Sequence, residues 1–229
     1  MTALGAEAPL LLDADDPSAV ARVAAALRSG HVAAIPTDTV YGLAAALDRP
    51  HAIARLYGLK SRPREKAIPV LLAEAAELEK IAADVPPGAR ALIERFWPGA
   101  LTIVVPALPA LPDEVTSVAA AGVLTVAVRV PDHRVARDVL AAAGGALAVT
   151  SANRSGDPPA LDAQAVLRLG NAAPDIVLDG GPAPLRHAST VVLAIGDEIV
   201  VLREDAIPAS RIAKVVQVGS ESWPEAHAV

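Results

Sequence analysis

The chain has 229 residues, of which 53% are hydrophobic but only 2% aromatic, so its core must be built from aliphatic side chains. It contains no cysteine, which excludes disulfides, thiolate catalysis and cysteine-ligated metal sites. The formal net charge of −6 argues against a general nucleic-acid-binding protein, whose surface is usually basic. With no signal-peptide pattern and no apolar run of the roughly 20 residues that span a bilayer, we expect a cytoplasmic protein without a membrane partner.

The first elements lead from a strand through a helix into a polar loop. Residues 10–12 predict a strand, and Asp16 with Pro17 predicts the N-cap and first position of a helix that ends at Gly30. Residues 31–35 predict a buried strand, and the hydroxyl-rich residues 36–43 follow it as a loop. Ligand groups often collect after a strand of an α/β protein. The alternative is a turn in which Thr and Asp bond to their own backbone, and for Asp38 we favour that local role.

The most unusual stretch is residues 60–66, Lys-Ser-Arg-Pro-Arg-Glu-Lys, which places four cations in seven residues of an acidic chain. It follows a helical pattern over residues 51–59 and precedes a strand-like run over residues 68–72. Pro63 disfavours helical backbone at Arg62, so we expect an exposed basic loop at this junction. Such a loop can bind an anion, whereas the simpler interpretation is a solvated basic loop.

The middle of the chain contains one strand with an unexpected charge. Residues 123–130 alternate as a strand, and Thr125 and Arg129 are four positions apart, on the same face. An arginine on such an apolar strand needs an anion, which is either a ligand or a buried structural ion pair, and no acidic residue flanks Arg129 on that face. The other elements expected here are helices over 74–82 and 86–96, a turn at 97–99, a strand over 101–105 and a loop over 106–118.

The last part of the chain predicts further mixed elements. Asp132 is expected to cap a helix that runs through Leu140, and a strand over 146–150 leads into the small, polar loop 151–156. The backbone N–H groups of this loop can face phosphate, but it lacks the spacing of known phosphate-binding motifs, and an ordinary loop is the simpler interpretation. Further along we expect a helix over 163–169, a strand over 176–178, a turn over 179–182, a hairpin over 189–203, a helix over 208–216 and a disordered tail over 217–229. Helices and strands intermix irregularly, so we expect one α/β domain, residues 1–216, with a mixed sheet.

Six short motifs occur in the order found in one known family. They are Pro36-Thr37-Asp38-Thr39-Val40-Tyr41-Gly42-Leu43, Lys60-Ser61-Arg62-Pro63, Trp97-Pro98-Gly99, Val126-Ala127-Val128-Arg129-Val130-Pro131, Ser151-Ala152-Asn153 with Ser155-Gly156, and Ser189-Thr190-Val191-Val192. On these motifs the chain resembles the YrdC-like family of threonylcarbamoyl-AMP synthases. The likeness covers about residues 15–216, and six motifs in order are far more specific than any one of them.

This resemblance implies a fold and a reaction. The fold is a twisted mixed α/β sheet curved around a deep, positively charged cavity. The reaction joins L-threonine, bicarbonate and ATP into threonylcarbamoyl-AMP and pyrophosphate, the first step of N6-threonylcarbamoyladenosine synthesis in tRNA. Lys60 and Arg62 match the catalytic pair that contacts the nucleotide phosphates and the carbamate. Thr37, Arg129, Val149 (through its backbone) and Ser189 match threonine-binding positions, and Lys60, Arg64, Thr125, Ser151, Asn153, Pro159 and Arg203 match ATP-binding positions.

The resemblance also implies partners. Magnesium is expected to arrive with the triphosphate, without a dedicated metal site. Downstream threonylcarbamoyl-transferase proteins and a transient tRNA contact are implied as well. The sequence departs from the family at Leu71, where many relatives have a histidine that can contact substrate. Longer relatives append a second, C-terminal domain, and we expect this chain to represent the form with the catalytic domain alone.

Two alternative functions remain open on the sequence. One is a carbamoyl-adenylating domain of the kind found in hydrogenase maturation and antibiotic carbamoylation. The other is a double-stranded RNA or ribosome-maturation binding module, against which the acidic charge and the scarcity of aromatic residues weigh. An RNA module needs only exposed cations, whereas an ATP-using enzyme needs Thr125, Arg129 and Ser189 to converge in one pocket.

Overall fold

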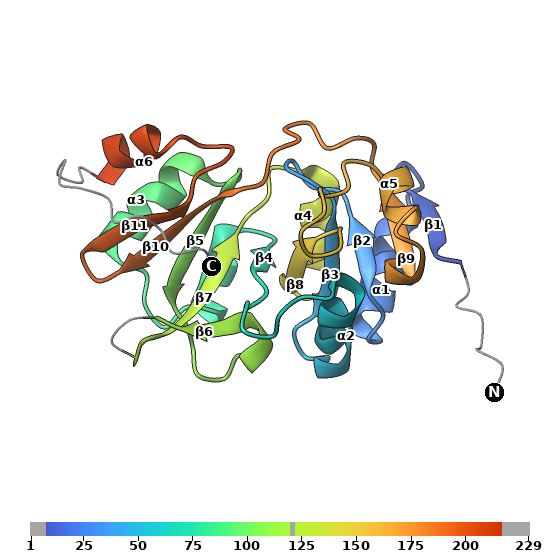
Figure 1. The fold of residues 1–229 in the computed structure, drawn as a ribbon, viewed down its shortest axis with the longest axis horizontal. Coiled ribbons are helices and arrows are strands. Elements are labelled where there is room, and N and C mark those ends of the chain that lie inside the picture. Colours follow the sequence, from blue (N-terminus) through green and yellow to red (C-terminus); the bar gives the residue numbers. More distant parts are fainter. Residues whose placement is uncertain (1–7, 120–121, 217–229) are drawn as a thin grey trace.

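A computed structural model describes residues 8–119 and 122–216, and its strands join into a single eleven-stranded sheet (Figure 1). The sheet order is β1-β9-β2-β3-β8-β4-β7-β5-β10-β11, with β6 paired to β7. The strands are β1 (Leu10–Asp13), β2 (Ala33–Ile35), β3 (Gly42–Ala46), β4 (Val70–Leu72), β5 (Leu101–Pro106), β6 (Thr116–Val118), β7 (Leu124–Arg129), β8 (Ala146–Ser151), β9 (Ile176–Asp179), β10 (Thr190–Ile195) and β11 (Glu198–Arg203).

Parallel and antiparallel pairs alternate irregularly along this order, so the predicted mixed sheet is confirmed. For example, β4 pairs in parallel with β7 but antiparallel with β8. Residues 217–229, predicted to be disordered, lie outside the described residues. The helices are α1 (Ala19–Arg28), α2 (Pro50–Lys60), α3 (Pro87–Phe96), α4 (Arg134–Ala142), α5 (Ala163–Leu167) and α6 (Ala209–Val216), with 3₁₀ turns η1 (Ala75–Lys80), η2 (Asp113–Val115) and η4 (Gly170–Ala172).

Two hydrophobic clusters lie on opposite faces of the sheet, because successive strand residues point to opposite sides. In β4, Val70 and Leu72 belong to the larger cluster with α2, α3 and α6, whereas Leu71 belongs to the smaller cluster with α1 and α4. The smaller cluster takes no residue from β5, β7 or β10. On that face, strands β7 and β5, which follow β4 in the sheet order, therefore carry buried polar side chains such as Arg129 and Thr102.

Several predicted boundaries are corrected by the structure. Helix α1 begins at Ala19 with Ser18 as N-cap, because the Asp16 carboxylate accepts a hydrogen bond from the Ser18 N–H in the turn before it. Helix α4 has His133 as its N-cap, and the His133 side chain accepts from Ala136 N–H, a role predicted for Asp132.

Other local assignments were also wrong. The predicted helix over 74–82 is the 3₁₀ turn η1, and the loop over 106–118 contains η2 and β6. The alanine-rich strand β3 was missed, because alanine carries no strand preference and its run follows a loop pattern.

Candidate active site

A cavity with a volume of about 180 Å³ opens near the centre of the sheet. It is lined by residues of six strands and the loops beside them: Thr37, Thr39, Val40, Tyr41, Gly42, Arg62, Pro69, Leu71, Thr102, Arg129, Val149, Thr150, Ser151, Ala188, Ser189 and Arg203. Within the described part of the chain, this lining contains three arginines and neither Asp nor Glu. The cavity is therefore suited to an anionic ligand that carries groups able to bond to hydroxyls.

Lys60 lies beside this cavity, but not in the way that the sequence suggested. It is the last residue of α2 and only 2% exposed, not part of an exposed loop. Its Nζ donates to the carbonyl oxygens of Ser151 (2.5 Å) and Asn153 (3.1 Å), to Asn153 Oδ1 (2.5 Å) and to Ser151 Oγ (3.2 Å). The ammonium thus ties the end of α2 to the end of β8 and the polar loop that follows it, where the predicted ATP-binding residues Ser151 and Asn153 lie.

Arg62 lines the cavity from the turn that follows α2. Ser61 there has left-handed backbone (φ 51°), which turns the chain away from the helix axis as Pro63 predicted. The Arg62 guanidinium donates to the carbonyl oxygens of Lys66 (2.9 Å) and Ala67 (2.8 Å), so it is held by its own loop. Burial of this side chain lowers the pKa of Arg62 from its usual range.

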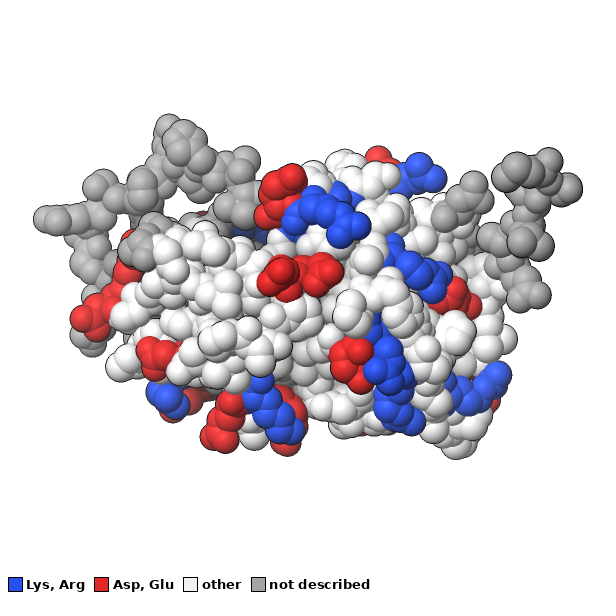
Figure 2. All heavy atoms as spheres, turned by 90° about the horizontal axis from the view of Figure 1, so that it is seen from below, with Lys and Arg blue, Asp and Glu red and all other residues white. Residues whose placement is uncertain are grey.

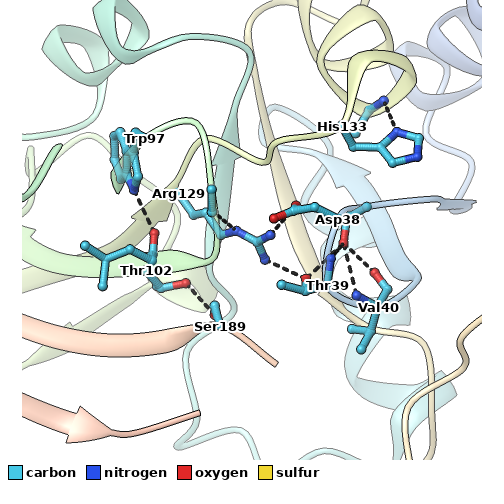
Figure 3. Close-up of polar contacts among 12 residues, drawn as sticks. Asp38, Thr39, Val40, Trp97, Thr102, Arg129, His133 and Ser189 are labelled. Atoms are coloured by element: carbon cyan, nitrogen blue, oxygen red, sulfur yellow. Dashed lines mark hydrogen bonds and ion pairs between the residues drawn. The ribbon is translucent and has the colours of Figure 1, made fainter. Parts of the chain in front are cut away.

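Arg129 sits at the end of β7 and is 5% exposed (Figure 3). Its Nε donates to Gly99 O (2.8 Å), Nη1 donates to Thr39 Oγ1 (2.8 Å), and Nη2 forms an ion pair with Asp38. The expected local turn role for Asp38 is therefore wrong, because its carboxylate lies against Arg129 across the sheet. The sequence pattern shows no acidic residue on the face of Arg129 in its own strand, and the partner comes instead from the loop after β2.

A pair of hydroxyl groups lies on another side of the cavity. Ser189 Oγ and Thr102 Oγ1 are 2.8 Å apart, and both side chains are buried (Figure 3). Thr102 faces the cavity because its strand neighbours Leu101 and Ile103 belong to the core on the other face. Thr102 is a cavity residue that was not predicted, although a polar residue inside the apolar run of β5 is a local signal for it. The Arg203 guanidinium donates to Ser189 O (2.7 Å) and so holds the backbone of Ser189 beside the cavity.

The remaining predicted threonine-binding residues also line the cavity. Thr37 Oγ1 donates to Val40 O (2.6 Å) and accepts from the N–H groups of Thr39 and Val40, so this hydroxyl also builds its own turn. Val149 reaches the cavity beside Gly42, where an added Cβ would lie only 2.5 Å from Val149 Cγ1. A glycine at this point of β3 is what allows the two strands to approach here.

Five predicted ATP-binding residues are not among the residues that line the cavity, and Lys60, described above, is one of them. Thr125 shares a face with Arg129, as expected, but its hydroxyl donates to Ser117 O (3.0 Å). Arg64 is exposed and lies over the Tyr57 ring, 5.5 Å from its centroid. Pro159 is half-buried and follows the loop of residues 151–156. Asn153 Oδ1 accepts hydrogen bonds from Lys60 Nζ and Ser151 Oγ, and of these residues only Ser151 lines the cavity. The structure thus brings together the threonine-side residues more fully than the nucleotide-side residues.

The chain matches a known protein family over most of its length. The family model named for Sua5, YciO and YrdC, described as telomere recombination, matches residues 25–205. The chain belongs to the Sua5/YciO/YrdC family. Threonylcarbamoyl-AMP synthase from Bacillus subtilis is 37% identical over 205 residues, which are 90% of this chain and 58% of that protein. A synthase of the same name from Halorhodospira halophila is 37% identical over 176 residues, 74% of this chain and 90% of that protein.

Solved structures of the Sua5/YciO/YrdC family share this fold. Pyrococcus abyssi Sua5, solved as a complex with L-threonine, superposes with a TM-score of 0.80 at 32% identity, over 90% of this chain and 60% of that one. Escherichia coli YciO superposes with a TM-score of 0.75 over 89% of this chain and 98% of that one, and at 21% identity this likeness concerns the fold alone. This chain thus spans little more than half the length of some relatives and nearly all of others.

Among the described helices, none is both long and apolar enough to cross a membrane.

Proposed function

We propose that the chain catalyses the formation of threonylcarbamoyl-AMP and pyrophosphate from L-threonine, bicarbonate and ATP. The observation that carries the proposal is the cavity itself, where three arginines and the hydroxyl pair Thr102–Ser189 face one space without an acidic residue among its described lining. Relatives at 37% identity bear the name of this activity, and the Pyrococcus abyssi relative was solved with threonine.

The chemistry requires positive charge at fixed places. The threonine amine condenses with bicarbonate, losing water, to give an N-carboxylate. A carboxylate oxygen then attacks the α-phosphorus of ATP, the bond to the β-phosphate oxygen breaks, and pyrophosphate leaves. Because one anion attacks another, preplaced cations must lower the repulsion, and we assign this role to Lys60 and Arg62.

The two ends of threonine are assigned to different residues around the cavity. Arg129 binds the α-carboxylate, while Ser189 and Thr37, with Val149 nearby, contact the amine and side chain. Ser151, Asn153 and Arg203 contact the nucleotide, and Arg64, Thr125 and Pro159 are assigned to its outer part. Magnesium enters with the triphosphate, which fits a cavity whose described lining offers no carboxylate. We place the reaction in the cytoplasm, where a downstream threonylcarbamoyl transferase passes the product to tRNA.

Pyrophosphate release by the purified chain tests this function. Release should require threonine, bicarbonate and ATP together, and the adenylate should be detected by mass spectrometry as threonylcarbamoyl-AMP. Release without threonine, or with carbamoyl phosphate in place of threonine and bicarbonate, would instead identify a carbamoyl-adenylating domain. The RNA-binding alternative predicts no turnover, and on the face seen in Figure 2 acidic and basic side chains intermix without a continuous basic patch.

Substrate selection gives a first prediction. A pocket that bonds to a substrate hydroxyl rejects an analogue lacking it, since its own polar groups are left unpaired, whereas losing one methyl contact costs only about 1–3 kcal/mol. We therefore expect serine to react about 10- to 200-fold less efficiently than threonine, and valine far less than serine. Adenylate formation at matched amino-acid concentrations measures this order. Equal use of valine and serine would remove the assigned roles of Ser189 and Thr37.

The pH dependence gives a second prediction. Burial, with a smaller effect of the nearby Arg62 charge, lowers the pKa of Lys60 to about 8. Since only the charged ammonium attracts phosphate, we expect kcat/KM for ATP to fall as pH rises through about 8. The Lys60→Arg variant stays charged and should move this fall to higher pH, while the protonation of the threonine amine is common to both proteins. If kcat/KM for ATP falls at the same pH in both proteins, the fall does not arise from Lys60.

Loss of folding does not explain such a fall in activity. Unfolded lysine keeps its proton to about pH 10.4, so between pH 8 and pH 10.4 the unfolded chain binds more protons at Lys60 than the folded chain. Stability from this group therefore rises with pH across that window. Thermal unfolding measured over the same pH range is the control.

A further inference from the structure

Arg129 is held by three partners from two segments, the turn before β5 and the loop after β2. They are Gly99 O before β5, Thr39 Oγ1 after β2, and the Asp38 carboxylate. Gly99 and Thr39 offer neutral acceptors, so Asp38 alone among these partners balances the guanidinium charge. The cavity is lined by Arg129 and Thr39 but not by Asp38, which therefore lies behind the arginine as seen from the cavity.

Among the described residues, Arg129 is the single hydrogen-bond partner of the Asp38 carboxylate. The aspartate is 3% exposed, one carboxylate oxygen contacts Arg129 Nη2, and the other has no hydrogen-bond donor among the described residues. A buried carboxylate without donors is unfavourable, and its backbone contact to Leu185 N–H (2.9 Å) involves only the carbonyl. The energy that keeps this side chain in place thus comes from the single contact to Arg129.

We propose that Asp38 is a positioning residue, which fixes the Arg129 guanidinium so that its remaining N–H groups receive the substrate carboxylate. Arginine has five N–H donors, and the three contacts use one on each nitrogen. One N–H remains on each terminal nitrogen, which matches the two oxygens of a carboxylate. That this carboxylate belongs to threonine rests on the proposed function, whereas the role of Asp38 in holding the Arg129 guanidinium does not.

The first arm of the test needs no ligand. A held guanidinium has slow rotation about its C–N bonds and gives separate NMR signals for its Nη protons, and the Arg129→Lys variant assigns these signals. In Asp38→Asn, which keeps the shape but loses the charge, we expect the Arg129 signals to merge into an average. Unchanged, separate signals in Asp38→Asn would overturn the proposal.

The second arm measures substrate requirements. In Asp38→Asn we expect the KM for threonine to rise about tenfold or more, because a misplaced binding group can cost up to about 10²-fold, while the KM for ATP stays within about twofold. Asp175→Asn is the matched control: Asp175 pairs bidentately with Arg55 at 2.8 Å, outside the cavity, so this change should lower thermal stability without altering the threonine KM.

The outcomes separate the two proposals. An unchanged or lowered threonine KM in Asp38→Asn would mean that Asp38 is structural, or that it competes with the substrate, and would overturn its positioning role. If the wild-type chain has no threonine-dependent activity, the proposed function fails, and the NMR arm alone decides the role of Asp38. If Asp38→Asn does not fold, Asp38→Glu replaces it in both arms, since it keeps the charge but moves the carboxylate by one methylene.

Discussion

Replacing Lys60 by alanine should remove most of the activity. Loss of a charge-assisted contact to a reacting anion raises the barrier by about 2–4 kcal/mol, which corresponds to about 30- to 1,000-fold in rate. Because Lys60 is buried, the same change also leaves the Asn153 carbonyl oxygen without its donor, whereas Ser151 O keeps the hydrogen bond from Asn153 N–H (3.1 Å). An unpaired buried acceptor costs about 1–3 kcal/mol, so we also expect a lower melting temperature.

The rate and the stability must therefore be measured separately. Pyrophosphate release is compared at a temperature at which both proteins are fully folded, as judged by circular dichroism. Lys66→Ala is the matched control, because Lys66 belongs to the same basic stretch but is exposed and outside the cavity lining. A Lys60→Ala protein with the rate of Lys66→Ala would show that Lys60 only joins α2 to the loop after β8.

Replacing Arg129 by lysine should change the threonine requirement far more than the ATP requirement. Lysine keeps a charge beside Asp38 but cannot reproduce a planar fork with donors in fixed directions. A hydrogen bond to a charged group contributes about 1.5–3 kcal/mol, so the KM for threonine should rise about 10- to 150-fold. The measurement is a pair of titrations, each substrate being varied while the other is saturating.

The control for this variant is Arg55→Lys, which weakens an ion pair remote from the cavity. It should leave both substrate requirements unchanged. Should Arg129→Lys raise the two requirements equally, Arg129 would be holding the fold or the nucleotide. A threonine KM equal to that of the wild type would remove Arg129 from the carboxylate site.

The sequence predicted the elements that have a strong local signal. Strand β7, with its alternating pattern, and the β10–β11 hairpin around Gly196-Asp197 lie where the patterns placed them. The same patterns could not find β3, because its alanines suit helix, loop and buried strand alike. What makes it a strand is its pairing with β2 and β8, which no local pattern contains.

The candidate site shows the same division between local and distant information. Residue type and position identified Arg129 as a charge that needs a partner, but the partner Asp38 lies far away in the chain. Likewise Lys60 was expected in solvent because it opens a basic stretch, whereas the end of α2 buries it against the loop after β8. Each of these errors concerns a contact that only the assembled sheet creates.

The place of β10 in the sheet also determines when the cavity can exist. The cavity walls take residues from Thr37 through Arg203, and β10 can pair with β5 only after every strand that precedes it in the chain has been synthesised. Such distant pairings slow folding, because a long loop must close before they form. A ribosome-bound chain that still lacks the last hairpin therefore has no complete cavity, so substrates stabilise only the finished protein and cannot assist its early folding.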